Sequence, residues 1–223
     1  MSRSRKAECG HFETVDLLAR IGNNLRKSTE RTPVPHMHGT WPLNIVNPSK
    51  SCKFSSNRTP MIIRPADATD LDSLHSLRNH YICNSYATFD EGLMSKEAVN
   101  AWMGSFGRSG PHRLYVATDA GRLLGFAGSQ QYRNHPAFRK TIETSIYVAP
   151  GAVGRGIGSA LYENLFKELS GEDLHRAVVG ISLPNDASVR MHRKTGFTEV
   201  GTFAEYAIKH DSYVSSVWMQ RAL

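Results

Sequence analysis

A glycine-rich turn between a strand and a helix constrains this chain more than any other stretch of its sequence. It lies in Tyr147–Leu161, Y-V-A-P-G-A-V-G-R-G-I-G-S-A-L. The β-branched and aromatic run at residues 141–148 predicts a strand, and apolar residues at four-residue intervals from Ile157 to Leu169 predict a helix directly after the turn. Because glycines leave backbone amides uncovered at a helix N-terminus, this turn predicts an anion site, for which a diphosphate is the simplest ligand.

The glycine spacing excludes two common phosphate-binding motifs. A Rossmann dinucleotide motif needs a glycine three residues after the second glycine, and the residue three after Gly156 is Ser159. No G-K-S/T sequence follows, so the turn is not a nucleoside-triphosphate P-loop. A tight strand-to-helix turn without a ligand remains an alternative interpretation of these residues alone.

Charge divides the chain near residue 60. Residues 1–60 contain ten Lys and Arg against four Asp and Glu, whereas residues 61–223 contain 17 against 16. The foldable part is therefore nearly neutral and is not expected to bind nucleic acid. Residues 1–60 lack apolar periodicity, which predicts a basic, mostly disordered N-terminal extension, although translation from Met61 is an alternative.

Cysteine usage and hydropathy indicate a compartment. The three cysteines form no C-x-x-C pair and fit no disulfide framework, which suits a reducing environment. The sequence shows no secretory apolar segment and no membrane span. We therefore expect a cytoplasmic protein without a membrane partner.

The order of predicted elements from Met61 onward indicates an α/β fold with a mixed sheet. Strands are expected at 61–64, 114–118, 123–130, 141–148 and 177–183, and helices at 71–81, at 95–106, after Gly156 and after Asn185. The last two strands, 197–203 and 213–220, are expected to form a hairpin with a long connection.

This order, the glycine turn and the spacing N-x-x-S-x-x-x-H-x-x-x-G-F at Asn185–Phe197 resemble the GNAT N-acetyltransferase superfamily over residues 61–223. N-H-Y-I near residue 80, A-T-F-D, T-I-E-T-S-I-Y-V and the late K-H are similar to its phosphinothricin N-acetyltransferases. The resemblance implies a mixed, mostly antiparallel central sheet, splayed at its middle and flanked by helices, with acetyl-coenzyme A in the V-shaped gap. It also implies a possible homodimer and requires no metal.

The chemistry of amine acetylation needs a base, because an ammonium has no lone pair with which to attack a thioester. By resemblance, Glu143 occupies the general-base position. From the residues alone, the simpler interpretation of Glu143 is an exposed carboxylate on an alternating strand. The resemblance also implies that His192 gives or relays a proton to the leaving thiolate. From the residues alone, a histidine on a helix is more often a surface residue without a role in catalysis. A backbone N–H of the strand, with Val148 as the candidate, should polarise the thioester carbonyl.

The resemblance assigns two further sets of residues. The residues expected to bind acetyl-coenzyme A are Tyr147, Val148, Val153, Gly154, Arg155, Gly156, Ile157, Gly158, Ser159, Asn185 and Ser188. The residues expected to bind the amine are Phe89, Tyr132, Arg133 and His135. His135 stands where the family usually has a second basic residue, and Tyr213-Val214-Ser215 stands where the family has W-H-D. The chain therefore departs from the set of residues with which the family binds an anionic substrate.

The resulting expectation is transfer of an acetyl group from acetyl-coenzyme A to the amino group of a small amino-acid-like molecule of the phosphinothricin or methionine sulfoximine type. Two alternatives remain open from the sequence. One is a protein or peptide N-acetyltransferase, and the other is a non-catalytic regulator that binds acetyl-coenzyme A.

Overall fold

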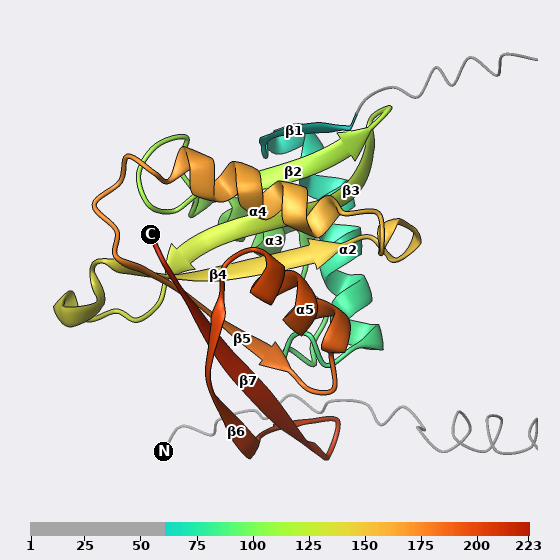
Figure 1. Cartoon of the computed structure of the whole chain (residues 1–223). Helices are drawn as coiled ribbons and strands as arrows, with labels where there is room; N and C mark the ends of the chain where they lie inside the picture. The colour runs from blue at the N-terminus through green and yellow to red at the C-terminus, as the bar shows by residue number, and fades with distance from the viewer. Residues whose placement is uncertain (1–60) are drawn as a thin grey trace, which may run out of the picture. The chain divides into compact units, whose positions relative to one another are not determined.

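The computed structural model describes residues 61–223, and the predicted N-terminal extension lies outside them (Figure 1). The described residues follow the order of elements expected from the sequence. The strands are β1 (Ile62–Pro65), β2 (Leu114–Asp119), β3 (Arg122–Gln131), β4 (Thr141–Val148), β5 (Arg176–Ser182), β6 (Thr198–Lys209) and β7 (Ser212–Ala222). The helices are α2 (Leu71–Asn84), α3 (Lys96–Gly104), α4 (Ile157–Glu168) and α5 (Asp186–Lys194).

The strands form one mixed sheet in the order β1-β2-β3-β4-β5-β7-β6. Neighbouring strands are antiparallel except β4 and β5, which are parallel. These two strands pair from Thr141 to Glu143 and then diverge, as Figure 1 shows. The predicted α/β fold with a mostly antiparallel sheet splayed at its middle is confirmed.

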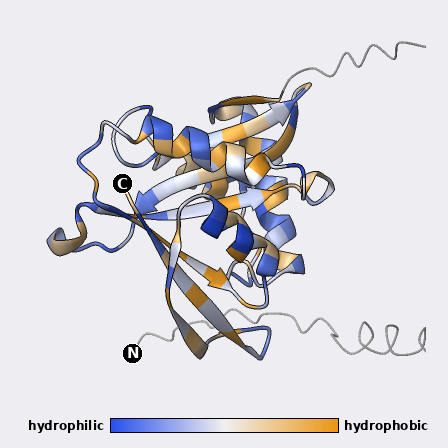
Figure 2. Cartoon of the chain, viewed as in Figure 1, coloured by the Kyte–Doolittle hydropathy of each residue, from blue (hydrophilic) through white to orange (hydrophobic). Residues whose placement is uncertain are grey.

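The helices cover both faces of the sheet. α4 packs on one face against residues such as Tyr115 and Ala127, and α2 and α3 pack on the other face against Val116 and Phe126. Side chains alternate between faces along a strand, so β2 and β3 each contribute to both hydrophobic clusters. Figure 2 shows α5 as mostly hydrophilic, in keeping with a helix at the surface.

Short sequence signals set the helix ends. Ser95 Oγ accepts a hydrogen bond from the Ala98 amide (3.2 Å) at the start of α3, and Asn185 Oδ1 accepts one from the Ser188 amide (3.1 Å) at the start of α5. Serine and asparagine are among the residues that most often cap a helix N-terminus in this way. Gly196 follows α5 with a φ of 90°, a left-handed conformation that glycine adopts without strain.

The predicted connection between the last two strands is wrong. β6 continues to Lys209 and β7 begins at Ser212, so a two-residue turn replaces the long connection. His210 and Asp211 have φ values of 48° and 58°, as a type I′ turn requires. Irregular register in β6, including a bulge between Phe203 and Ala207, interrupts the alternation that the sequence pattern depends on.

Candidate active site

The divergence of β4 from β5 exposes one edge of β4. The Ala149 amide donates to the Leu124 carbonyl at 2.8 Å, and the register between β3 and β4 has no shift. Backbone groups alternate in direction along an antiparallel strand, so those of Ile146 and Val148 point away from β3. Because pairing with β5 stops at Glu143, this part of the edge can pair with a molecule that lies in the gap like an added strand.

The glycine turn lies at the end of this gap. Gly154 and Gly156 have φ values of 80° and 79°, and α4 begins at Ile157, directly after them. Gly158 lies in the first turn of α4, where a Cβ atom would already contact the side chains of Ile146 and Met191 at 3.5 and 3.6 Å. The turn therefore brings uncovered amides and the positive end of the α4 dipole to the gap, which favours a diphosphate.

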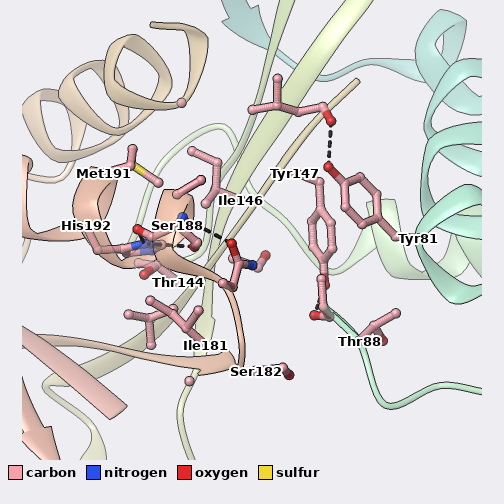
Figure 3. Close-up of a pocket in the computed structure, with 18 of the residues that line it drawn as sticks. Tyr81, Thr88, Thr144, Ile146, Tyr147, Ile181, Ser182, Ser188, Met191 and His192 are labelled. Carbon is pink, nitrogen blue, oxygen red and sulfur yellow. Dashed lines mark hydrogen bonds between the residues drawn. The ribbon is translucent and has the colours of Figure 1, made fainter. Parts of the chain in front are cut away.

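A cavity of about 550 Å³ follows the gap from the glycine turn to the loop after α2 (Figure 3). Thirteen of the seventeen predicted site residues line it, and they come from both sides of the gap. They are Phe89, Glu143, Tyr147, Val148, Val153, Gly154, Gly156, Ile157, Gly158, Ser159, Asn185, Ser188 and His192.

Four predicted residues lie outside this lining. The Arg155 side chain is half-exposed, with Nη2 3.9 Å from Asp119 Oδ2. Tyr132, Arg133 and His135 lie in the loop before β4, and the Arg133 guanidinium stacks over the Tyr132 ring at 5.1 Å. His135 Nδ1 accepts a hydrogen bond from the backbone of the following turn. The structure thus places the expected anion-binding loop beside the cavity, and its role stays a prediction.

Glu143 reaches the cavity at the point where β4 and β5 separate. It is half-buried, and burial raises the pKa of its carboxyl above the ordinary value. A carboxylate with a raised pKa is a stronger base, and activity at neutral pH favours such a shift. Its position and environment therefore suit a group that accepts a proton from a bound amine.

His192 lies on α5 with only 1% of its surface exposed. Its Nδ1 is 2.8 Å from the Ser188 carbonyl oxygen, which only accepts, so Nδ1 carries the proton. Nε2 is then an acceptor for the Tyr162 hydroxyl at 3.0 Å, and that hydroxyl lies 3.2 Å from Thr144 Oγ1. Burial lowers the pKa of His192 to about 4, which keeps the imidazole neutral at pH 7.

Two tyrosines, Tyr81 and Tyr147, line the side of the cavity opposite His192 (Figure 3). Tyr81 on α2 donates its hydroxyl to the Val148 carbonyl at 2.7 Å, and Tyr147 donates to the Ala87 carbonyl at 3.2 Å. The two rings pack edge to face with centroids 4.9 Å apart. Together they fix β4 relative to α2 and to the loop that follows it.

An aromatic part of the lining was missed by the sequence analysis. Tyr206 and Trp218 both line the cavity, and the Tyr206 ring meets Phe89 edge to face at 5.9 Å. Tyr206 lies in the β6 bulge, which includes Glu205 with a φ of 50°. No local sequence signal predicts that bulge. The signal that could have been used is Tyr206 itself, an aromatic residue in one of the last strands.

The family model described as the acetyltransferase (GNAT) family matches residues 74–197. The chain belongs to this family.

Relatives within the GNAT family agree with the predicted subgroup. The chain is 47% identical over 163 residues to a phosphinothricin N-acetyltransferase of Streptomyces coelicolor, covering 72% of this chain and 95% of that protein. It is 29% identical over 163 residues to an L-methionine sulfoximine/L-methionine sulfone acetyltransferase of Salmonella typhimurium, covering 73% and 95%. A crystal structure of a phosphinothricin acetyltransferase from Sinorhizobium meliloti in complex with acetyl-coenzyme A matches with a TM-score of 0.69 at 29% identity, covering 73% and 88%.

The cavity fits the co-substrate that members of this family bind. The glycine turn offers amides to a diphosphate, and the free edge of β4 offers backbone groups to an extended amide-containing arm. Among residues 61–223, no cluster of three or more His, Cys, Asp or Glu side chains is arranged to hold a metal ion. None of the helices in this range is long and apolar enough to cross a membrane.

Proposed function

We propose that residues 61–223 transfer the acetyl group of acetyl-coenzyme A to the amino group of a small amino-acid-like molecule. The observation that carries this proposal is the position of Glu143, a half-buried carboxylate with a raised pKa. It lines the cavity where the free edge of β4 begins and the glycine turn lies beyond. A base next to an acyl-binding edge is the arrangement that direct amine acetylation requires.

In the proposed mechanism, Glu143 accepts the proton that the amine loses, so that the amine nitrogen can form a bond to the thioester carbonyl carbon. The carbon–sulfur bond breaks with its electron pair on sulfur, the acetyl group stays on nitrogen, and the thiolate takes one proton, which balances the one that Glu143 has accepted. The Val148 amide, on the edge of β4 that faces the gap, is proposed to donate to the carbonyl oxygen as negative charge develops there. No covalent intermediate with the protein is needed.

His192 is proposed to act by relay and positioning, not as a charged acid. Its low pKa leaves almost no imidazolium at neutral pH, and its Nδ1 proton is held by the Ser188 carbonyl. The neutral ring accepts a hydrogen bond from the Tyr162 hydroxyl at Nε2, and the oxygen of that hydroxyl lies 3.2 Å from Thr144 Oγ1 on β4. Of the two roles expected from the sequence, direct donation or relay, this environment favours relay.

The substrate class is proposed from the relatives together with the cavity. Relatives named for phosphinothricin and for methionine sulfoximine or sulfone differ in whether the substrate side chain carries an anionic phosphinate. Phe89, Tyr206 and Trp218 provide an apolar wall for either side chain. The Tyr132 ring lies 6.0 Å from the indole of Trp218, which lines the cavity, and the Arg133 guanidinium stacks over the Tyr132 ring.

A homodimer is proposed as the assembly. β6 is an edge strand and carries exposed large apolar side chains at Val200, Phe203 and Ile208. An edge strand with unpaired backbone groups and exposed apolar side chains is usually covered by another segment, and β6 of a second copy of the chain could cover it. Light scattering on the purified chain tests this, because a monomeric mass at micromolar concentration would contradict it.

The reaction is tested by following release of free coenzyme A with a thiol reagent. The panel holds phosphinothricin, methionine sulfoximine, methionine sulfone, ordinary amino acids, polyamines and short peptides. Turnover confined to amino-acid analogues supports the proposal. Turnover confined to peptides supports a protein N-acetyltransferase, and tight acetyl-coenzyme A binding without turnover supports a regulator.

A further inference from the structure

Lys209, the last residue of β6, has no exposed surface. Its Nζ donates to the carbonyl oxygens of Ile82, Ser85 and Thr88 at 2.8, 2.8 and 2.9 Å. An ammonium group carries three N–H donors, so each of them has a backbone acceptor. Burial of a charge is costly, and these three bonds are what offsets that cost here.

The acceptors lie at the C-terminal end of α2 and just beyond it. Ile82 is in the last turn of the helix and Ser85 is its C-cap. The final carbonyls of a helix lack partners within the helix and carry partial negative charge, which favours a cation. Burial lowers the pKa of Lys209, whereas the nearby carboxylates of Asp90 and Glu91 favour its charged form.

The segment that Lys209 holds is also a wall of the candidate active site. Ala87, Thr88 and Phe89 line the cavity, and residues 85–91 belong to no helix or strand. Besides Lys209, the Tyr147 hydroxyl donates to the Ala87 carbonyl at 3.2 Å. The His210 amide donates to Glu91 Oε1 at 2.6 Å. The wall is thus fastened to the sheet by bonds from side chains and from the β6–β7 turn.

We propose that Lys209 is a positioning residue for the amine: its ammonium group fixes the backbone at Ser85 and Thr88 and thereby places Phe89 against the amine end of the cavity. Phe89 packs on Tyr206, which lies three residues before Lys209 on β6. One strand therefore supplies both the aromatic partner of Phe89 and the cation that holds its loop. None of the hydrogen bonds of Lys209 reaches the glycine turn, so acetyl-coenzyme A binding should not depend on Lys209.

The test replaces Lys209 by Met, which is similar in length but has no donors. Loss of the donors leaves the buried carbonyl of Ile82 and the part-buried carbonyls of Ser85 and Thr88 without this partner, so the Michaelis constant for the amine should rise by about tenfold or more. The Michaelis constant for acetyl-coenzyme A should stay within about twofold. Lys209→Gln, which keeps two donors on a shorter side chain, should give a smaller rise and replaces the Met variant if that one does not fold.

The matched control is Arg113→Met, which removes another mostly buried cation. Arg113 pairs with Glu172 at 2.5 Å and is not part of the cavity lining. It should lower thermal stability without a change in the amine Michaelis constant. Equal changes in both Michaelis constants for Lys209→Met, or no change in either, would show that Lys209 only stabilises the fold and would overturn the proposal.

The kinetic readout rests on the proposed function, so a second readout is independent of it. Hydrogen–deuterium exchange followed by mass spectrometry should show faster exchange at residues 85–91 in Lys209→Met than in the wild type, with unchanged exchange at residues 154–160. If the wild type acetylates no amine in the panel, the proposed function fails while this measurement still decides on Lys209. Unchanged exchange at residues 85–91 would contradict its role.

Discussion

The hydroxyl of Tyr81 donates a 2.7 Å hydrogen bond to the carbonyl oxygen of Val148, on the edge of β4 that turns away from β3. This bond ties the last turns of α2 to the end of β4, in the part of that strand that is not paired with β5. It holds the backbone of Val148, the residue whose own amide, in the preceding peptide group, is proposed to polarise the acetyl carbonyl.

Tyr81→Phe should therefore lower turnover while leaving the fold intact. Removal of one such bond corresponds to about a two- to tenfold effect on turnover at saturating substrates. The exposed Tyr86 provides a matched control, because Tyr86→Phe removes a hydroxyl outside the cavity lining. Steady-state kinetics on both variants checks this, and equal activity of the two would remove the Tyr81 bond from the mechanism.

Glu143→Gln should lower turnover by about a hundred- to ten-thousandfold, since it removes a positioned base. In the wild type, the rate should rise with pH through the raised pKa of Glu143 and then level off, whereas the variant should lose this dependence. Glu163→Gln on the exposed side of α4 serves as the control and should keep the wild-type profile.

The same substitution predicts a change in stability. The folded state holds the Glu143 proton more tightly than the unfolded state, so its contribution to stability falls as pH rises above the ordinary Glu pKa. At pH 8, Glu143→Gln should therefore melt at the same temperature as the wild type or higher. Thermal melts at pH 8 would contradict this if the variant were clearly less stable.

His192 should make the stability of the fold depend on pH in the opposite direction, with a loss of stability at acidic pH. Its folded pKa of about 4 lies below the ordinary value of 6.5, so the unfolded state binds the proton more tightly and stability is lost as pH falls from about 6.5 toward 4. A shift of this size corresponds to about 3 kcal/mol across that range. His192→Gln should flatten the decline in unfolding free energy, and the exposed His175→Gln should not. Urea unfolding at several pH values measures it.

Gly156→Ala tests the glycine turn. A left-handed conformation costs a residue with a Cβ atom about 1–2 kcal/mol, although the site has space for the atom itself. Relaxation of that strain should misplace the amides of the turn and raise the Michaelis constant for acetyl-coenzyme A by about tenfold. Gly92→Ala is the control, since Gly92 has free space and no positive φ. Similar constants for both variants would contradict the assigned role.

Much of the fold could be predicted because its signals are local. The strand at 141–148, the glycine turn and the helix after Asn185 each depend on residues within a few positions of one another, and each was found where it was expected. The divergence of β4 and β5 followed from the resemblance to the family. It could not follow from pattern alone, because strand pairing across 34 residues leaves no periodic trace.

The rest of the site depends on contacts between distant segments. The bulge that brings Tyr206 to Phe89 breaks the alternation of β6, and the His-Asp turn lacks the usual Asn-Gly signal. Lys209 meets its three carbonyls more than 120 residues away in sequence. A lysine in a strand is expected to be exposed, so its burial could be seen only in the folded chain.

The most direct test of the central claim is the release of coenzyme A by wild-type protein with methionine sulfone or phosphinothricin, measured beside Glu143→Gln. Mass spectrometry of the product identifies the acetylated nitrogen. We predict rapid release that depends on the amine, a product acetylated on its amino group, and near loss of both in the variant. Equal rates in the two proteins, or no acetylated product from any amine in the presence of bound acetyl-coenzyme A, would contradict it.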